Sequence, residues 1–309
     1  MSALRRLFLI IALTCMWSPS FLFIKLAVAE LPPLTIVTLR VGVAAIVLCL
    51  ILLFKRRALP LDLNFWICSA VMALFASVLP FVLFCYAEQS IESALAAILN
   101  GCSPMFTAIL AHAFLPSDRL SAQKAVGISL SSAGLLLLFT PNIQQGFSGT
   151  TMGIIAGATA AFCYAISHVY AKKYTTGYPP FVIPTAQLLC SAMMMLPFTL
   201  YYDAPLSLPM PSMGAIFGVC GLILFGTILA FIIYYKLLEH CGPTAISMVA
   251  CFFPVVGMLL GFVFLGETLS WVGLGASCLI FMGLLFVTGV VDIKPLLVRF
   301  QRTAQREGL

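Results

Sequence analysis

Ten long apolar runs, separated by short polar breaks, make up almost the whole of this 309-residue sequence. A membrane helix needs roughly 20 apolar residues to cross a hydrocarbon core about 30 Å thick. Because lipid cannot satisfy unpaired backbone groups, runs of this length are predicted to be helices. The predicted spans are residues 7–28, 34–54, 65–87, 91–115, 123–140, 152–172, 180–202, 213–238, 243–265 and 270–291.

The composition points to the same class of protein. Hydrophobic residues make up 62% of the chain and charged residues only 8%, whereas a soluble domain carries about 25% charged residues. A chain this apolar cannot cover a surface that faces water, and ten spans leave room only for short connections. We therefore predict an all-α polytopic membrane protein with about ten transmembrane helices and no separate soluble domain.

The basic residues predict how the spans are oriented. If the N-terminus is cytoplasmic, all but two of the 16 Lys and Arg residues fall on cytoplasmic segments, and none falls in an outer loop. The positive-inside rule then places both termini in the cytoplasm, which requires an even number of spans. The two exceptions, Lys25 and Arg40, lie within the first two spans near their outer ends. This distribution explains the net charge of +6 by membrane orientation, so no nucleic-acid partner is expected.

The two halves of the sequence align with each other. Residues 17–45 align without gaps on residues 164–192, at an offset of 147. Further on, polar and proline positions match at an offset of 150, namely Ser77 with Thr227 and Pro104 with Pro254. Because five spans per copy is an odd number, the second copy enters the membrane from the opposite side, as a 5+5 inverted-topology repeat. The predicted units are a first five-helix copy, a second five-helix copy and a basic cytoplasmic tail, at residues 1–145, 146–292 and 293–309.

An inverted repeat favours transport. Two nearly equivalent halves of opposite orientation can exchange conformations, which opens a central site first to one side of the membrane and then to the other. The alternatives are a membrane-embedded enzyme and a sensor. An intramembrane protease would need paired aspartates or a Ser–His pair at depth, and the neighbours Ser167 and His168 point about 100° apart on a helix. We therefore expect a carrier and not an enzyme.

Three segments carry recognisable patterns: W-S-P-S-F-L-F-I-K-L-A at 17–27, A-L-A-A-I-L at 94–99, and G-P-T-A-I-S with G-E-T-L near the last three spans. They resemble the EamA-type members of the drug/metabolite transporter superfamily over nearly the whole chain. The resemblance implies a carrier of small polar or amphipathic metabolites, such as amino acids or related compounds, with a cavity lined by spans 1, 3, 4, 6, 8 and 9. The family's Gly-Glu turn stands before the tenth span at Gly266-Glu267, but the fifth span follows Pro116-Ser117-Asp118 instead.

Polar and aromatic residues at mid-depth are the candidate substrate ligands, because polar groups cost free energy in lipid and tend to face the bundle interior. The candidates are Trp17, Ser18, Ser77, Asn100, Ser103, Tyr164, Ser167, Thr227 and Ser247. Each hydroxyl has an alternative role, since Ser and Thr in membrane helices commonly bond their own i−4 carbonyl or a neighbouring helix. The symmetry mates Trp17 and Tyr164 are equally compatible with core packing.

Two prolines and two cations complete the candidate site. Pro104 and Pro254 are predicted to kink their helices, because proline removes a backbone hydrogen bond. Lys25 and Arg40 could hold an anionic group in an outer vestibule. In the alternative interpretation, Lys25 extends toward the interface and Arg40 pairs with Glu30 or a backbone carbonyl.

All ten acidic residues map to loops or helix ends, and none to mid-membrane. Since many proton-coupled carriers use a buried carboxylate as a relay, uniport or exchange is expected. No cofactor or metal is expected, because three dispersed histidines form no ligand set. The expected partners are a small-molecule substrate and the lipid bilayer, with a homodimer left open. The resemblance implies a bacterial inner membrane as the location.

Overall fold

The computed structural model describes residues 3–115, 120–143, 149–175, 178, 181–234, 237, 249, 252–267 and 271–291. Every regular element within these ranges is a helix. Eight helical stretches are long and apolar enough to cross a membrane, at Phe8–Val28, Pro33–Phe54, Leu63–Glu88, Ser93–Phe114, Thr150–Tyr174, Val182–Asp203, Met213–Tyr234 and Trp271–Thr288. The chain is therefore an all-helical, multi-pass membrane protein.

The helices follow the predicted runs closely. In chain order they are α1 (Ala3–Trp17), α2 (Ser20–Val28), α3 (Pro33–Phe54), α4 (Leu63–Ala73), η1 (Leu74–Val78), α5 (Leu79–Glu88), α6 (Ser93–Asn100), α7 (Ser103–Phe114), α8 (Ala122–Ile143), α9 (Gly149–Tyr174), α10 (Val182–Phe198), η2 (Thr199–Asp203), η3 (Pro205–Ser207), α11 (Met213–Ile223), η4 (Leu224–Leu229), α13 (Phe253–Leu265) and α14 (Trp271–Thr288). Two predicted spans, 123–140 and 243–265, are not among the eight apolar stretches given above. The helices α8 and α13 lie within or overlap these two spans.

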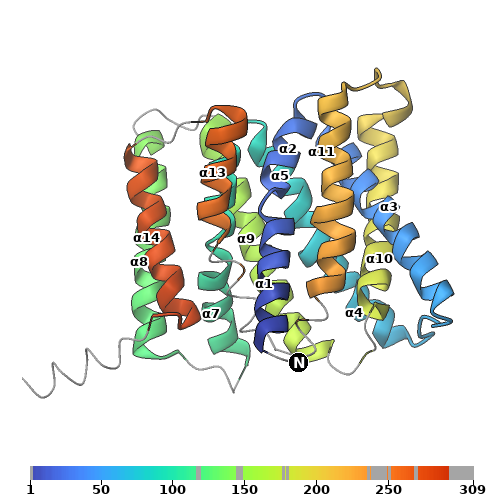
Figure 1. Cartoon of the computed structure of the whole chain (residues 1–309), viewed down its shortest axis with the longest axis horizontal. Coiled ribbons are helices and arrows are strands. Elements are labelled where there is room, and N and C mark those ends of the chain that lie inside the picture. Colours follow the sequence, from blue (N-terminus) through green and yellow to red (C-terminus); the bar gives the residue numbers. More distant parts are fainter. Residues whose placement is uncertain are drawn as a thin grey trace, which may run out of the picture.

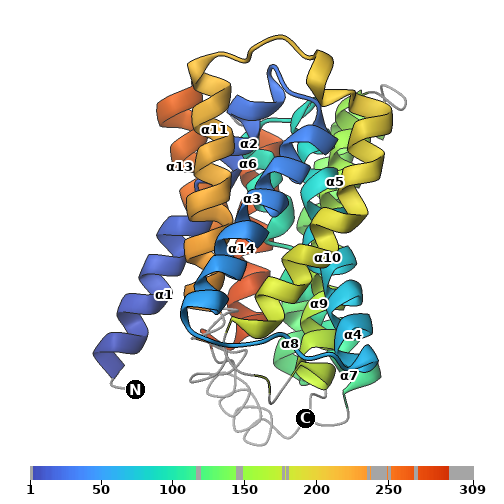
Figure 2. The ribbon, with the colours of Figure 1, turned by 90° about the vertical axis from the view of Figure 1, so that its right-hand side faces the viewer.

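The helices run side by side along one axis, so their connections gather at two ends (Figure 1). The connections at 29–32, 89–92 and 204–212 lie at one end, and the start of α1 and the connection at 55–62 lie at the other (Figure 2). We call the first of these the capped end, after the charged side chains described below. The tail at 293–309 lies outside the described residues.

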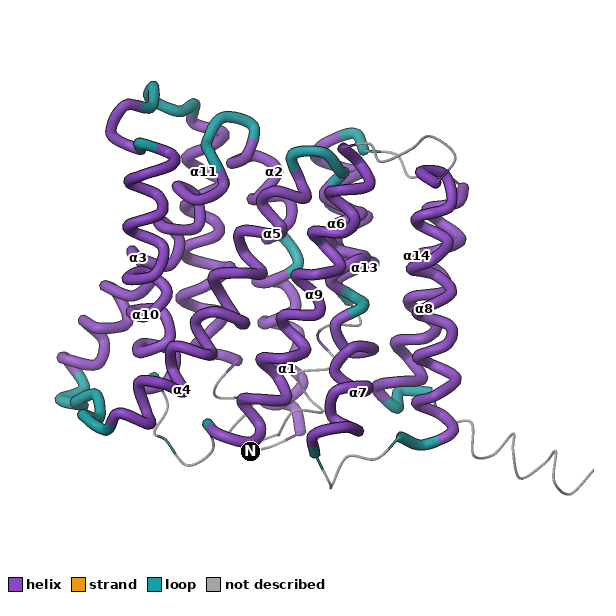
Figure 3. Tube along the Cα trace, turned by 180° about the vertical axis from the view of Figure 1, so that it is seen from behind, coloured by secondary structure: helices purple, strands orange, loops and turns teal. Residues whose placement is uncertain are grey.

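Two spans are interrupted inside the bundle, where short non-helical segments appear among the helices (Figure 3). The break between α1 and α2 falls at Ser18 and Pro19, and Pro19 has no N–H to donate along the helix. The break between α6 and α7 falls just before Pro104, which lies in the first turn of α7. Pro254 likewise lies in the first turn of α13. Both prolines therefore stand where a helix begins.

Two π-helical segments interrupt the spans that contain Ser77 and Thr227. They are η1 and η4, which begin at Leu74 and Leu224, at the offset of 150 found in the sequence. A π-helix bonds residue i to i+5 and inserts one extra residue into the turn, and such segments are frequent at functional sites.

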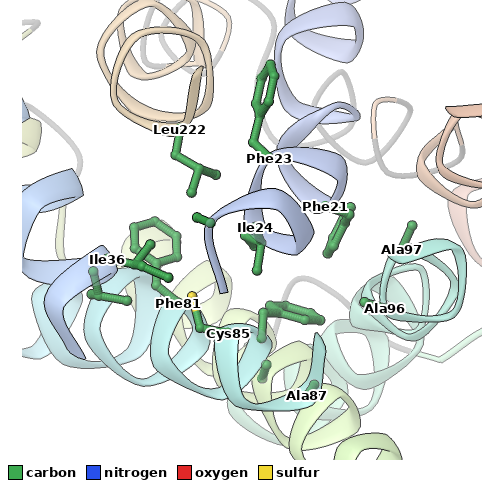
Figure 4. Packing of buried hydrophobic residues seen from close by; sticks show 14 of the residues in the cluster. Phe21, Phe23, Ile24, Ile36, Phe81, Cys85, Ala87, Ala96, Ala97 and Leu222 are labelled. Carbon is green, nitrogen blue, oxygen red and sulfur yellow. The ribbon is translucent and has the colours of Figure 1, made fainter. Parts of the chain in front are cut away.

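The α8–α14 pair packs backbone against backbone, and the two helices lie side by side in Figure 1. A Cβ added at Gly127 would lie 2.6 Å from the Gly283 carbonyl oxygen, and one added at Gly134 would lie 2.7 Å from the Ala276 carbonyl oxygen. Small residues at these points let the helices approach closely. Away from this pair, the main core joins α2, α3, α5, α6 and α11 through residues such as Phe21, Ile24, Ile36 and Phe81 (Figure 4).

Candidate functional site

A buried arginine joins the two halves of the chain. Arg40, on α3, is only 5% exposed. Its Nε donates to Thr227 Oγ1 at 2.8 Å and its Nη2 donates to the Gly226 carbonyl oxygen at 3.1 Å. The guanidinium also lies over the ring of Phe81, with Cζ 3.6 Å from the ring centroid, a cation–π geometry.

The π-helical turn η4 contains both hydrogen-bond acceptors of this arginine, Thr227 and Gly226. Within η4, the Thr227 hydroxyl donates to the Leu222 carbonyl oxygen at 3.0 Å, five residues back. Its remaining lone pairs are then free to accept from Arg40. An added Cβ at Gly226 would lie 3.3 Å from Arg40 Nη2 and 3.1 Å from Ser20 Oγ. The absence of a side chain at Gly226 thus lets α2, α3 and η4 meet at one point.

A second, neutral pair repeats this arrangement in the other half. Gln187, on α10, donates from Nε2 to the Ser77 hydroxyl at 2.8 Å, and both residues are buried. Gln187 follows Arg40 at the repeat offset of 147, and Thr227 follows Ser77 at 150. Each half therefore contributes a donor to the π-helix of the other half.

The surroundings of Arg40 favour an anion. Among the residues that the structure describes, no carboxylate forms an ion pair with Arg40, and a buried unpaired charge is costly. Tyr164 and Cys85 lie close enough to Arg40 to interact with it electrostatically. The buried hydroxyl of Ser20 has no hydrogen-bond partner in the described part of the chain. A ligand carboxylate would satisfy both the cation and the hydroxyl.

Aromatic side chains line the neighbouring helix breaks. The Trp17 ring lies 5.5 Å from Tyr234 and 6.3 Å from Phe253, centroid to centroid. Tyr164 stacks with Phe84 at 6.2 Å and with His168 at 6.5 Å. These contacts join the two predicted aromatic symmetry mates to separate groups of rings, which pack the bundle.

The other predicted site residues differ in their surroundings. The hydroxyls of Ser18 and Ser103, at the α1–α2 and α6–α7 breaks, are buried without a partner among the described residues. Asn100 is buried at the end of α6. Ser167 instead donates to the Tyr164 carbonyl oxygen of its own helix at 2.8 Å. Ser247 and the side chain of Pro254 lie outside the described residues.

Lys25 and Arg40 have different hydrogen-bond partners. Its Nζ donates to the carbonyl oxygens of Glu88 and Ile91, both at 2.7 Å, and so closes the C-terminal end of α5. Lysine near a helix C-terminus commonly bonds the last carbonyls in this way.

Sequence reasoning missed three acidic caps at the capped end. Glu267 accepts from Ser93 N at 2.7 Å, Ser93 Oγ at 2.9 Å and Ala94 N at 3.0 Å, at the start of α6. Asp203 accepts from Thr35 N and Oγ1 at the start of α3, and Glu30 accepts from Ser212 before α11. Carboxylates near helix N-termini are stabilising, but the partners are more than 160 residues apart in sequence. Only the Gly266-Glu267 turn offered a signal for one of them.

The sequence profile of the EamA-like transporter family matches residues 4–140 and 151–289. The chain is 28% identical to the uncharacterized inner membrane transporter YedA of Escherichia coli K12, over 85% of each protein. It is 26% identical to a probable amino-acid metabolite efflux pump of Salmonella typhimurium, over 97% of this chain and 98% of that protein. A solved crystal structure shares the fold, with a TM-score of 0.65 at 19% identity over 93% of this chain and 98% of that chain. This chain belongs to the EamA-like transporter family.

Proposed function

We propose that this protein is a secondary transporter that moves a small polar or amphipathic metabolite, an amino acid or a related compound, by alternating access as a uniporter or exchanger. It works as ten spans in a 5+5 inverted repeat, with units at 1–145 and 146–292 and a cytoplasmic tail at 293–309. Both termini face the cytoplasm of a bacterial inner membrane. The inner-membrane and efflux-pump names of the relatives support this assignment.

The observation that best supports the proposal is that each half donates a hydrogen bond to the π-helix of the other half. Arg40 bonds Thr227 while its repeat mate Gln187 bonds Ser77, as expected when two copies are related by a twofold axis in the membrane plane. The π-helices η1 and η4 and the α8–α14 contact follow the same relation. Two such halves can exchange conformations around a shared centre.

In this proposal, Arg40 binds a carboxylate group of the substrate. A guanidinium binds a carboxylate through two parallel hydrogen bonds, and here it stands beside the unpartnered Ser20 hydroxyl. Trp17, Ser18, Asn100, Ser103 and Tyr164 are the proposed ligands for the rest of the molecule. The hydrogen bonds to Ser77 and Thr227 hold the two halves together, and these bonds break when the cavity opens.

The test substitutes Arg40 by Gln, the residue that stands at the matching position in the second half and bonds a hydroxyl there. Arg40→Gln should fold, but its uptake of labelled amino acids into proteoliposomes should fall at least about tenfold, since a hydrogen bond to a charged group contributes about 1.5–3 kcal/mol. Lys55→Gln, at the end of the same helix, should transport normally. If neither the wild type nor either variant moves any amino acid or related carboxylate, the proposed function is wrong.

A further inference from the structure

Glu88 is a buried carboxyl group at the capped end of the bundle. It ends α5, is 1% exposed, and neither of its carboxylate oxygens has a hydrogen-bond partner in the described part of the chain. Three other acids at this end, Glu30, Asp203 and Glu267, accept hydrogen bonds at helix starts. Glu88 lies at a helix end, as its place in the sequence predicts, but unlike most helix ends this one is buried.

The charged neighbours of Glu88 come from two other elements. Lys25, on α2, binds the backbone carbonyl oxygen of Glu88 and not its carboxylate. The Lys25 ammonium nevertheless attracts a negative charge on the Glu88 carboxyl group, and Glu267 repels it more weakly. Ser93–Asn100 of α6 and residues 149–160 of α9 contain no titratable residue, and the partly exposed Glu92 directly precedes α6. Since an unpaired buried carboxylate is costly, this geometry suits the neutral acid.

Apolar rings separate Glu88 from the opposite end of the bundle. Phe84 lies one turn below it on α5 and packs edge-on against Phe21 at 5.3 Å. Both rings are nearly fully buried, at 2% and 6% exposure. Toward the capped end, by contrast, the exposed residues Gln89 and Ser90 follow at once. The nearest water to Glu88 is therefore at the capped end.

We propose that the Glu88 carboxyl group is a proton-binding site that operates a gate at the capped end. The acid holds its proton while this end is closed, and releases it to the adjacent water when the end opens. Ionised Glu88 attracts the Lys25 ammonium away from the carbonyl oxygens of Glu88 and Ile91, and it repels Glu267, whose contacts with Ser93 and Ala94 hold α6 in place. Loss of the proton therefore favours opening. Because the proton enters and leaves on one side, this gate carries no net proton across the membrane. The inference rests on the proposed alternating access, in which each end must open and close.

Infrared difference spectroscopy on the full chain in nanodiscs tests the protonation itself. The wild type at neutral pH should show the carbonyl stretch of a protonated carboxylic acid, sensitive to deuterium. The band should be absent in Glu88→Gln and present in Glu92→Gln, the same change four residues on at a partly exposed site. A wild type without this band, or a band that survives in Glu88→Gln, overturns the proposal. This measurement needs no substrate and stands apart from any failure of the transport assay.

Hydrogen–deuterium exchange tests the gate. After correction for the intrinsic rate, exchange of the amides at 89–96 in the wild type should rise with pH, by up to about tenfold per pH unit for one linked proton. Glu88→Gln, a permanently neutral mimic, should stay protected and lose this pH dependence, while Glu92→Gln should retain it. Equal pH dependence in the wild type and Glu88→Gln would show that the carboxyl group does not control the gate.

Discussion

Charged side chains in this protein hold helix ends together across the bundle. Lys25 closes the C-terminal end of α5, and Glu30, Asp203 and Glu267 each hold the start of another helix. These contacts give the capped end a set of long-range tethers at the points where the spans turn. The sequence predicted Lys25 and Arg40 as unusual from their depth, but their partners depend on tertiary packing that no local pattern encodes.

Glu30 gives a prediction about pH. The Ser212 hydroxyl and amide hold the pKa of Glu30 below its ordinary value. A carboxyl group with a lowered folded-state pKa contributes stability above its unfolded pKa, and this is lost as the pH falls through the folded pKa. The melting temperature of Glu30→Gln should therefore lie below that of the wild type at neutral pH, and the gap should close below about pH 4. A gap that stays constant from neutral to acidic pH would contradict this role.

At the scale of elements, the boundaries of the spans followed from hydrophobicity, but their irregularities did not. The apolar runs predicted most of the described helices within a few residues, because length and hydrophobicity decide where a chain crosses lipid. The start of the predicted span at 243–265 and the end of that at 213–238 lie outside the described residues. The π-helices η1 and η4 could not be predicted in this way, because one extra residue in a turn changes neither the length nor the hydrophobicity of a span. Likewise, the sequence matched Ser77 with Thr227, but only the packing of α3 and α10 shows what each hydroxyl binds.

The α8–α14 contact gives a prediction at this scale. Gly127→Ala would place a methyl group 2.6 Å from the Gly283 carbonyl oxygen, so the helices must separate, at a cost of about 1–3 kcal/mol. Gly42→Ala is the matched control, because nothing lies within 4 Å of its added Cβ, and alanine is the better helix former. Thermal unfolding in detergent should show a lower melting temperature for Gly127→Ala, and an unchanged or higher one for Gly42→Ala. Equal effects of the two changes would rule out the proposed close approach.

For the whole molecule, the apolar runs and the family resemblance together predicted a multi-pass membrane transporter fold. The structure and the family match agree with this. The ten spans are predicted from the apolar runs, and their orientation is predicted from the basic residues. Leu206 and Leu61 are 96% and 98% exposed and lie at opposite ends of the bundle. A cysteine at each position can therefore show which side of the membrane that end faces.

Labelling of whole cells tests that orientation. Leu206→Cys should react with a membrane-impermeant maleimide from outside, because its loop lies at the capped end. Leu61→Cys should react only after the cells are permeabilised, and the parent protein with its native cysteines gives the background. Reaction of both variants from the same side would place the two ends together and remove the basis for ten alternating spans.

The unequal tethers between the halves have an energetic consequence. Two identical copies related by a twofold axis would interconvert between mirror states of equal free energy. One copy here binds its partner through a guanidinium and the other through an amide, and charge-assisted hydrogen bonds are roughly twice as strong as neutral ones. A difference of about 1.4 kcal/mol corresponds to a tenfold ratio of populations. In the proposed alternating access, a guanidinium at one of two matching positions and an amide at the other is thus enough to favour one of the two states.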